Sequence, residues 1–430
     1  MKLLVIGSGG REHAIVRALK KSPRVAEIHV LPGNGGISED AVCAPIAATD
    51  IDGAVAYAKE HGMDFAVVTP DDPLCLGMVD AMEAAGIPCF GPDRRAAEIE
   101  GSKVFAKGLM KKYGIPTAAY EVFDNAEEAL KYVESAPAPI VVKADGLALG
   151  KGVVVAMTRE EAAAAVKNAM LDRAFGESGA RVVIEEYLEG PEMSVLSFTD
   201  GSTLVPMVAS MDHKRALDGD EGPNTGGMGA IAPNPYYTPE VAAECMEKIF
   251  LPTVRAMNAE GRPFRGCLYF GLMLTKDGPK VIEYNCRFGD PETQAVLPLL
   301  KTDLLDVMEA VAAGRLSEIN VEWLDKCSCC LVLASGGYPK AYKKGLPISG
   351  LTGGQMPGSG VEVFHAGTKK LPDGSLVTNG GRVLGLTAVA DTLREAVEAA
   401  YSAAGKIGFE DMHYRRDIGA RALAAPGMEG

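Results

Sequence analysis

The chain has 430 residues, a length typical of about three domains, and its 47% hydrophobic and 23% charged residues form an ordinary globular composition. This composition excludes a mainly disordered protein. Its 43 basic and 57 acidic residues give a formal charge of −14, which excludes a broad basic surface that follows a nucleic-acid backbone. We therefore expect no nucleic-acid partner, and any phosphate site must be local.

The cysteines and apolar runs indicate where the protein resides. Cys327, Cys329 and Cys330 lie in an apolar run that ends in glycines. This pattern predicts a buried strand with reduced thiols, because a zinc site of this type needs a second cysteine pair. No apolar run approaches the ~20 residues of a membrane span, and the first residues do not form a signal peptide. We expect a cytoplasmic protein with no membrane contact.

The first hundred residues alternate short apolar runs with helical patterns. Apolar runs without polar alternation are typical of strands covered on both faces, so we predict a doubly wound parallel sheet. A polar crossover at 91–103 leads out of it. The expected strands are 3–6, 28–31, 65–68 and 87–90, and the expected helices are 11–20, 53–60 and 74–85.

The rhythm changes from residue 120 onward. A small ββαββ-like lobe is predicted, followed by a glycine- and charge-rich loop at 212–229, further helices and strands, and a small C-terminal α+β part. The Thr-Asn-Gly-Gly at 378–381 predicts a hairpin there. The lobe comprises strands 139–143, 153–155, 181–186 and 193–198 with a helix at 159–170; strands 203–208, 267–275 and 279–285 and helices from 238 and at 304–312 follow.

The first glycine turn, GSGGREH at 7–13, follows a strand and opens a helix. A dinucleotide fingerprint would place its third glycine at Glu12, and the acidic ribose anchor after the second strand is also missing. An exposed helix N-terminus for some phosphate or anion and a tight turn without a ligand both remain open.

The second glycine turn, at 144–152, resembles a Walker A loop but departs from it. Asp145 stands where the leading glycine belongs, and Gly152 follows Lys151 where Ser or Thr should stand. A hairpin in which Gly146, Gly150 and Gly152 expose backbone N–H groups, with charge from Lys143 and Lys151, suits a flap over a polyphosphate. A flexible surface hairpin is the alternative.

The segment from Lys280 carries a possible metal site. On a strand, Glu283, Asn285 and Arg287 share one face, while Ile282 and Tyr284 enter the core. A carboxylate beside an amide oxygen suits Mg²⁺, and the guanidinium offers a planar fork for an anion. A solvated polar face with an internal Glu–Arg pair is the alternative.

Motifs along the whole chain resemble one enzyme family. VIGSGGREHA, VVKADGLALGKGV, GPNTGGMGA, KVIEYNCRFGDPETQ and TNGGRVLGLTA occur in the order typical of the phosphoribosylamine–glycine ligases, also called glycinamide ribonucleotide synthetases, of the ATP-grasp superfamily. The resemblance implies a Rossmann-like domain at 1–102, an ATP-grasp domain at 103–323 with a flap lobe at about 117–190, and a C-terminal domain at 324–430. The chain has Thr69-Pro70-Asp71 where the family commonly has Gly-Pro-Glu.

The resemblance also implies where ATP and a metal bind. Glu283 and Asn285 would hold Mg²⁺ or Mn²⁺, and Glu192 would contact the ribose hydroxyls. Lys103 and Lys143 would reach the phosphates, and the hairpin with Gly146, Gly150, Lys151 and Gly152 would fold over them. The backbone that would face the adenine comprises Glu185, Glu186, Tyr187 and Leu188.

The implied reaction joins glycine to 5-phosphoribosylamine at the expense of ATP, through glycyl phosphate. Arg287, Lys143 and Lys103 would be catalytic, and Arg287 would orient an anionic substrate group. The substrate pocket would comprise Gly9, Gly10, Arg11, Glu12, Asp212, Lys214, Asn224, Thr225, Gly226 and Gly227 together with Arg287.

Three other functions compete with this one. Another ATP-grasp ligase is disfavoured by the first-turn GGREH and the PNTGGMGA loop, and a nicotinamide-dependent oxidoreductase is disfavoured by Glu12. A non-catalytic nucleotide-binding module is disfavoured because Glu283, Asn285 and Arg287 and the two lysines are all present.

Overall fold

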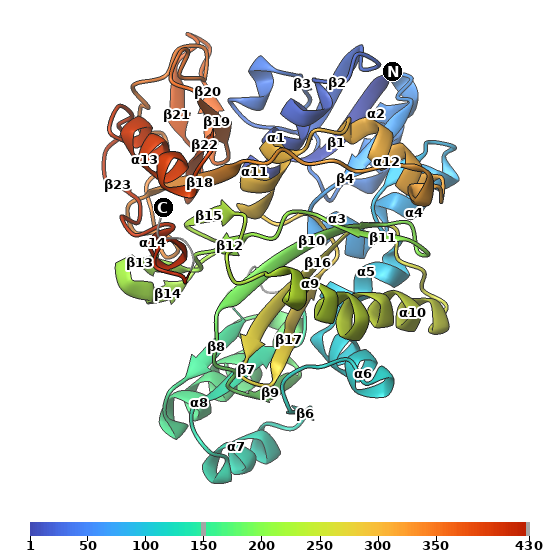
Figure 1. The fold of residues 1–430 in the computed structure, drawn as a ribbon, viewed down its shortest axis with the longest axis vertical. Helices are drawn as coiled ribbons and strands as arrows, with labels where there is room; N and C mark the ends of the chain where they lie inside the picture. Colours follow the sequence, from blue (N-terminus) through green and yellow to red (C-terminus); the bar gives the residue numbers. More distant parts are fainter. Residues whose placement is uncertain (148–151, 427–430) are drawn as a thin grey trace.

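The computed structural model describes residues 1–147 and 152–426. Figure 1 shows the N-terminal sheet (blue) and the C-terminal sheet (orange and red) at one end of the molecule. The small lobe with α7 (Ala126–Ser135) and α8 (Arg159–Val166) lies at the other end. The strands β10 (Glu192–Thr199), β16 (Gly266–Thr275) and β17 (Gly278–Asn285) lie between them. The chain thus folds as an α/β protein of several packed sheets.

The N-terminal sheet is parallel and doubly wound, as predicted, with strand order β3-β2-β1-β4-β5. Leu4 and Ile6 pack with helices α2 and α4 on one face, while Leu3 and Val5 pack with α1 and α12 on the other. The strand order reverses at β1, where ligands of such sheets bind beyond the carboxyl ends. The strands are β1 (Lys2–Gly7), β2 (Glu27–Pro32), β3 (Val42–Cys43), β4 (Phe65–Val68) and β5 (Cys89–Phe90), and the helices are α1 (Gly10–Leu19), α2 (Ile51–Glu60), α4 (Met78–Ala84) and α12 (Leu304–Ala312).

One expectation for this region is wrong. The helix expected at 74–85 is split into α3 (Asp71–Leu76) and α4, because Gly77 adopts a left-handed φ of 96° between them. The crossover expected at 91–103 contains helix α5 (Arg94–Gly101), whose N-cap Asp93 accepts a hydrogen bond from the backbone N–H of Ala96. Local capping thus makes a helix of a polar segment.

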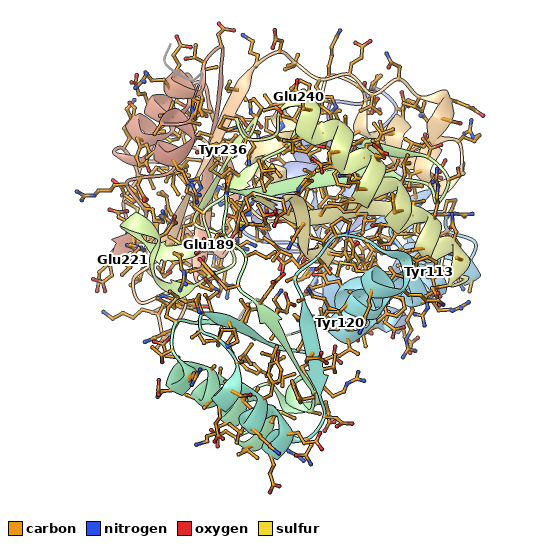
Figure 2. All side chains as sticks on the ribbon, turned by 60° about the horizontal axis from the view of Figure 1, so that its bottom comes forward. Tyr113, Tyr120, Glu189, Glu221, Tyr236 and Glu240 are labelled. Atoms are coloured by element: carbon orange, nitrogen blue, oxygen red, sulfur yellow. The ribbon has the colours of Figure 1, made fainter. Side chains whose placement is uncertain are left out.

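The small lobe is an antiparallel sheet with order β6-β9-β7-β8, and α7 and α8 cover one of its faces. The prediction of a ββαββ unit is wrong in two respects: the strand at Tyr120 was missed, and the strand at 193–198 belongs to another sheet. Lys107 Nζ of α6 (Lys103–Tyr113) lies 5.5 Å from the ring centroid of Tyr120, so the lobe contacts that helix. Figure 2 labels Tyr120 on the small lobe and Tyr113 at the end of the helix. The elements are β6 (Tyr120–Phe123), α7 (Ala126–Ser135), β7 (Ile140–Ala144), β8 (Val153–Ala156), α8 (Arg159–Val166) and β9 (Val182–Glu186).

The larger antiparallel sheet has the order β11-β10-β16-β17 and faces the small lobe. Phe270 of β16 and Tyr284 of β17 pack against Phe250 and Met257, which fixes the strand that carries Glu283 to a helical layer. The elements are α6 (Lys103–Tyr113), β10 (Glu192–Thr199), β11 (Leu204–Pro206), α9 (Pro239–Cys245), α10 (Leu251–Ala259), β16 (Gly266–Thr275) and β17 (Gly278–Asn285).

The C-terminal sheet has the order β12-β15-β18-β22-β19, with β23 paired to β18. Its first two strands come from the two ends of the 212–229 loop, so this loop is rooted in the C-terminal sheet. The elements are β12 (Met211–Asp212), β13 (Arg215–Leu217), β14 (Glu221–Asn224), β15 (Gly229–Ala232), α11 (Glu292–Val296), β18 (Cys327–Ser335), β19 (Val361–His365), β22 (Arg382–Ala390), α13 (Leu393–Ala404), β23 (Met412–His413) and α14 (Ala420–Leu423).

Strand β18 carries the cysteine cluster in the expected place. Cys329 and Cys330 are fully buried and all three thiols are free, and burial raises the pKa of Cys330 to about 12. Among the described residues, no group of three or more His, Cys, Asp or Glu side chains is arranged to hold a metal. None of the described helices is both long and apolar enough to cross a membrane.

The hairpin predicted at 378–381 is wrong. Strand β21 (Leu376–Thr378) pairs with β20 (Thr368–Lys370), whereas β22, which follows the turn, pairs with β18 and β19. The backbone N–H of Asn379 donates to the carbonyl of Gly367 at 2.7 Å, so the glycines make a close crossing between two sheets.

Candidate active site

Strand β17 presents the predicted metal ligands. Glu283 lies opposite Gly271 of β16, and Asn285 lies opposite Tyr269. A β-bulge next to Glu283 displaces Ile282, which is only partly buried, and Val281 enters the core instead. The expectation that Ile282 lies in the core is therefore wrong, because a bulge adds one residue and shifts the alternation.

Three lysines surround Glu283. Lys214 Nζ lies 3.4 Å from Glu283 Oε1. Burial alone would raise the pKa of Glu283, but Lys214, Lys143 and Lys103 lower it to about 2. The structure thus gathers charged residues from four separate segments around one carboxylate that these lysines keep ionised.

Two of these lysines are fixed by carbonyl groups. Lys143 Nζ donates to the carbonyl of Ile282 at 3.0 Å, and Lys103 Nζ donates to the carbonyl of Gly146 at 2.9 Å. Burial lowers the pKa of Lys103. The two ammonium groups approach the site from the small lobe and from α6, so they can face one ligand from two sides.

Strand β17 ends at Asn285, so the expectation that the strand reaches Arg287 is wrong. Arg287 is held by a contact that the sequence did not predict. Its Nη2 lies 2.8 Å from Glu100 Oε1 and 3.0 Å from Asn285 Oδ1. Its Nε is buried and has no hydrogen-bond partner among the residues that the structure describes. Burial raises the pKa of Glu100, whereas Arg287 opposes that rise. The guanidinium is thus held by Glu100, Asn285 and the carbonyl of Phe288, and its buried Nε–H lacks an acceptor in the described part of the chain.

After β7, the described part of the glycine hairpin contacts a short helical turn. The N–H of Gly146 donates to the carbonyl of Ser178 at 3.3 Å, and Ser178 Oγ donates to the carbonyl of Leu147 at 3.0 Å. Gly152 accepts from the N–H of Ala144 at 2.8 Å. The predicted site residues Gly150 and Lys151 lie outside the described residues.

The segment expected to face the adenine leaves strand β9. Glu185 pairs with Tyr120 and Val141 on its two sides, and its carboxylate forms ion pairs of 3.0 Å with Lys107 and Lys143. The backbone N–H of Ala119 donates to the Glu186 carboxylate at 3.0 Å.

Tyr187 and Leu188 lie beyond the end of that strand, and Tyr187 is exposed. Glu192, at the start of β10, lies 3.7 Å from Lys214 Nζ. These residues lead from the small lobe, which contributes Lys143, into the large sheet, which contributes Glu283.

The carboxylate of Glu12 holds the first glycine turn through hydrogen bonds. It accepts from the N–H of Gly9 at 2.5 Å, from Arg11 Nε at 2.6 Å and from Thr69 Oγ1 at 2.6 Å. A Cβ at Gly7 would lie 2.6 Å from Glu12 Cγ, so the turn closes over this side chain. Thr69, which replaces the family's glycine, thus takes part in fixing the turn.

The neighbouring residues of the first turn reach the segment after β17. Arg11 Nη1 donates to the carbonyl of Phe288 at 3.1 Å. A Cβ at Gly9 would lie 3.1 Å from Asp290 Oδ2, and one at Gly10 would lie 2.6 Å from Gln294 Nε2. The predicted first turn and the carboxylate strand therefore border one region.

The 212–229 loop approaches this region from the C-terminal sheet. Thr225 Oγ1 donates to the carbonyl of Lys214 at 2.9 Å, and Gly227 donates its N–H to Thr225 Oγ1 at 2.9 Å. A Cβ at Gly227, whose φ is 112°, would lie 2.4 Å from Pro291 and 2.7 Å from Asp212 Oδ1. Burial, and next the charge of Glu292, raises the pKa of Asp212.

Asn224 and Gly226 lie at the edge of the same loop. Asn224 ends β14 opposite Arg215, and Gly226 donates its N–H to the hydroxyl of Tyr338 at 3.1 Å. Lys214 and Gly227 of this loop thus approach β17 and the segment after it, whereas Asn224 and Gly226 contact the hairpin and the C-terminal part.

Several neighbouring residues were missed by the sequence analysis. Arg382 Nη1 donates at 2.6 Å to the carbonyls of Gly226 and Asp290, and Glu292 is 4% exposed. Arg382 lies in the motif TNGGRVLGLTA and Glu292 in GDPETQ, so family motifs point to both residues. Their spacing in the sequence, however, predicts no function for either. Glu100 and Lys107 lie on helices with no such motif.

Three family profiles match consecutive parts of the chain. They describe the phosphoribosylglycinamide synthetase N domain at residues 1–100, its ATP-grasp (A) domain at 101–293 and its C domain at 328–421. The matches therefore cover most of the chain in one order.

Individual proteins agree with the profiles. The chain is 52% identical to a phosphoribosylamine–glycine ligase of Halalkalibacterium halodurans over 424 residues, covering 99% of this chain and 98% of that protein. It is 51% identical to one of Vibrio vulnificus over 427 residues, covering 99% of both. The crystal structure of a phosphoribosylamine–glycine ligase from Thermotoga maritima matches with a TM-score of 0.85 and 36% identity, over 97% of this chain and 100% of that one.

A more distant structure shares the fold. The biotin carboxylase domain of the Hydrogenobacter thermophilus 2-oxoglutarate carboxylase, solved with MgADP, matches at 19% identity and a TM-score of 0.73, over 96% of this chain and 91% of that one. The predicted α/β architecture with an ATP-grasp core and the resemblance seen in the motifs are thus confirmed. The chain belongs to the phosphoribosylamine–glycine ligase family of the ATP-grasp enzymes.

Proposed function

We propose that the chain ligates glycine to 5-phosphoribosylamine with ATP and forms glycinamide ribonucleotide, ADP and phosphate, a reaction of purine biosynthesis. It is thus an ATP-dependent carbon–nitrogen ligase. The observation that carries this proposal is the ionised Glu283 encircled by Lys214, Lys143 and Lys103, in a chain that matches all three domains of the family. We also propose a cytoplasmic location and domain limits at 102/103 and 323/324.

We place ATP between the small lobe and β17. Lys103 and Lys143 would contact its phosphates under the 146–152 hairpin, Glu185 to Leu188 would border the adenine, and Glu192 would bind the ribose. Because the Glu185 carboxylate is already paired with Lys107 and Lys143, its backbone rather than its carboxylate is suited to the base.

The donor atoms of Glu283 and Asn285 fit Mg²⁺ or Mn²⁺. Both offer hard oxygen ligands on one strand face, and the phosphates of ATP can supply further oxygens. The ion, when bound, neutralises charge on the polyphosphate. Lys214 contacts Glu283 at 3.4 Å, so binding of a cation there requires Lys214 to shift toward Glu192 or the phosphates.

The chemistry needs an activated carboxylate. A carboxylate oxygen of glycine attacks the γ-phosphorus, ADP leaves, and glycyl phosphate forms. The amine of phosphoribosylamine then attacks the carbonyl carbon, phosphate leaves, and the nitrogen loses a proton. Arg287, whose buried Nε–H has no acceptor among the described residues, would orient the anionic groups, and the lysines would stabilise charge on the transferred phosphoryl group.

The test measures ADP release with each substrate omitted in turn. We expect release to require both glycine and phosphoribosylamine, and glycinamide ribonucleotide to appear in equal amount. Glu283→Gln should lower turnover by roughly 10²-fold or more, because the charge of a proposed metal ligand is lost. Glu247→Gln, at an exposed acid outside the site, should not change it. ADP release with another acid in place of glycine and another amine in place of phosphoribosylamine would refute the proposed function.

A further inference from the structure

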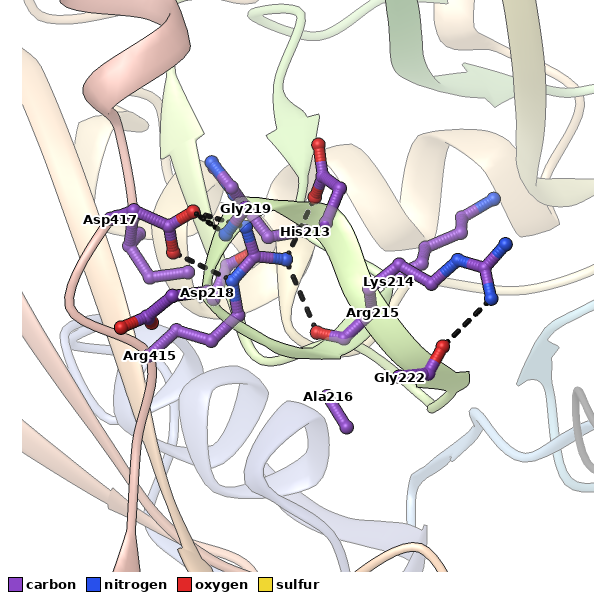
Figure 3. A network of polar contacts seen from close by, with 12 residues as sticks. His213, Lys214, Arg215, Ala216, Asp218, Gly219, Gly222, Arg415 and Asp417 are labelled. Atoms are coloured by element: carbon purple, nitrogen blue, oxygen red, sulfur yellow. Dashed lines mark hydrogen bonds and ion pairs between the residues drawn. The ribbon is translucent and has the colours of Figure 1, made fainter.

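The hairpin formed by β13 and β14 is held from outside by the C-terminal segment 413–419. This hairpin lies within the 212–229 loop, whose Asp212, Lys214 and Asn224 we assign to the substrate site. Figure 3 shows Arg415 reaching from the C-terminal segment to the backbone of the hairpin. We call residues 413–419 the brace.

Arg415 is the centre of the brace. Its side chain is 1% exposed, although it carries a full charge. Nη1 contacts Asp220 Oδ1 at 2.9 Å and the carbonyl of Arg215 at 3.2 Å, while Nε and Nη2 contact the two carboxylate oxygens of Asp417 at 2.8 and 2.7 Å. The planar fork of arginine thus joins the hairpin to the brace, a geometry that lysine cannot reproduce.

Other contacts surround this one. Asp417 Oδ2 accepts from the N–H of Gly219 at 2.9 Å, and Asp218 Oδ1 accepts from the N–H of Arg416 at 2.7 Å. His413 Nε2 contacts the carbonyl of Ala216 at 2.7 Å. The brace therefore holds the hairpin at its tip and along β13.

The contacts converge on both neighbours of Lys214. His213 Nε2 accepts from the N–H of Gly419 at 3.2 Å, and the carbonyl of Arg215 accepts from Arg415. Lys214, between these anchors, directs its ammonium away from the brace to Glu283 at 3.4 Å and Glu192 at 3.7 Å. A shift of the brace therefore moves the lysine at the reacting phosphates.

We infer that Arg415 is a positioning residue for the ligation: with Gly419 it fixes the backbone of residues 213–215, so that the Lys214 ammonium stays within reach of Glu283, Glu192 and the phosphates. This inference rests on the proposed function, because that function gives Lys214 its role. Misplacement of a catalytic group by ~1 Å can cost about 10²-fold in rate.

The test compares Arg415→Lys with Arg416→Lys. Both substitutions keep the charge, but Arg416 is exposed, and its side chain makes no hydrogen bond or ion pair with the described residues. We expect Arg415→Lys to lower kcat/KM for phosphoribosylamine by about 10-fold or more, with glycine and ATP saturating. Arg416→Lys should match the wild type. Thermal melts show whether each variant is folded.

A double-mutant cycle separates positioning from a general structural effect. If Arg415 acts through Lys214, Arg415→Lys should lower the residual activity of Lys214→Met by less than about 2-fold. Asp220→Asn, which removes one contact at a side chain 56% exposed, should behave in the same way but more weakly and gives the answer if Arg415→Lys does not fold.

Two results would overturn the inference. One is wild-type activity in folded Arg415→Lys, or in Asp220→Asn if the former does not fold. The other is an Arg415→Lys substitution that lowers activity by the same factor in the wild type and in Lys214→Met. A wild type that forms no glycinamide ribonucleotide would refute the proposed function itself, so the two failures are distinguishable.

Discussion

Most charged side chains of the site form an ion pair with another charged side chain. Glu100 holds Arg287 at 2.8 Å, Glu185 holds Lys107 and Lys143 at 3.0 Å each, and Lys214 lies beside Glu283. Buried charges of this kind are costly unless they are paired, so each pair fixes a geometry more than it adds stability. The site is thus preorganised before a substrate enters.

Arg287→Lys tests whether this geometry matters for the reaction. We expect turnover to fall by about 10²-fold, because lysine keeps the charge but cannot contact Glu100 and Asn285 and also orient a substrate anion. The measurement is ADP release that depends on glycine and phosphoribosylamine, beside a thermal melt. Arg265→Lys, at an exposed arginine, is the control. An active variant, or one inactive only because it is unfolded, would contradict the assignment.

The hairpin between β7 and β8 depends on the element beside it. A Cβ at Gly146 would lie 2.3 Å from Ser178 Oγ and 2.7 Å from Ser178 Cβ, so alanine at this position must displace one of the two segments. Gly146 also supplies the carbonyl that accepts from Lys103. Displacement of this carbonyl disturbs a lysine that we assign to ATP.

Gly146→Ala should therefore raise the KM for ATP by roughly 10-fold, since a misplaced lysine contacts the phosphates less well. Ser178→Gly removes both crowded atoms, and the double variant should recover part of the loss. Gly108→Ala on α6, where a Cβ would meet nothing within 4 Å, should leave the KM unchanged. Equal KM values for Gly146→Ala and the wild type would remove this hairpin from the nucleotide site.

Elements whose pattern is local were predictable from the sequence. The parallel strands of the N-terminal sheet and the face shared by Glu283 and Asn285 follow from apolar runs and from alternation. Pairing between distant segments was not predictable: the strand at 193–198 joins β16, and the glycines at 378–381 join two sheets. Arg287–Glu100 likewise links residues 187 positions apart, which no spacing rule connects.

Across the whole molecule, buried histidines join the C-terminal sheet to its neighbours. The N–H of His365 donates to His13 Nδ1 at 2.8 Å, while His13 Nε2 contacts Asp40 at 3.0 Å. His213 lies between the carbonyl of Gly229 and the N–H of Gly419. The nitrogens of His13 and His213 that accept these N–H groups must be unprotonated, so these contacts require neutral rings.

The pKa values of these histidines predict acid sensitivity of the folded state. Burial, and next the charge of Arg415, lowers the pKa of His213 to about 4; burial and then His13 lower that of His365 to about 4. In the unfolded chain these two histidines bind protons near pH 6.5, whereas in the folded chain they bind them only near pH 4. The contribution of these histidines to the free energy of unfolding should therefore be fully present above pH 6.5 and be lost as the pH falls toward 4.

At pH 5 unfolding should accordingly take up about one proton for each of these two histidines, beyond any uptake by carboxylates. Calorimetric unfolding in buffers of different ionisation enthalpy measures this uptake directly. His365→Gln should lower it by about one proton relative to the wild type, because the glutamine has nothing to protonate in either state. The same substitution should leave uptake near pH 8 unchanged, where the histidines are neutral in both states. Unchanged proton uptake at pH 5 in His365→Gln would show that this ring is already charged in the folded protein, and the contacts of the C-terminal sheet would then not explain acid sensitivity.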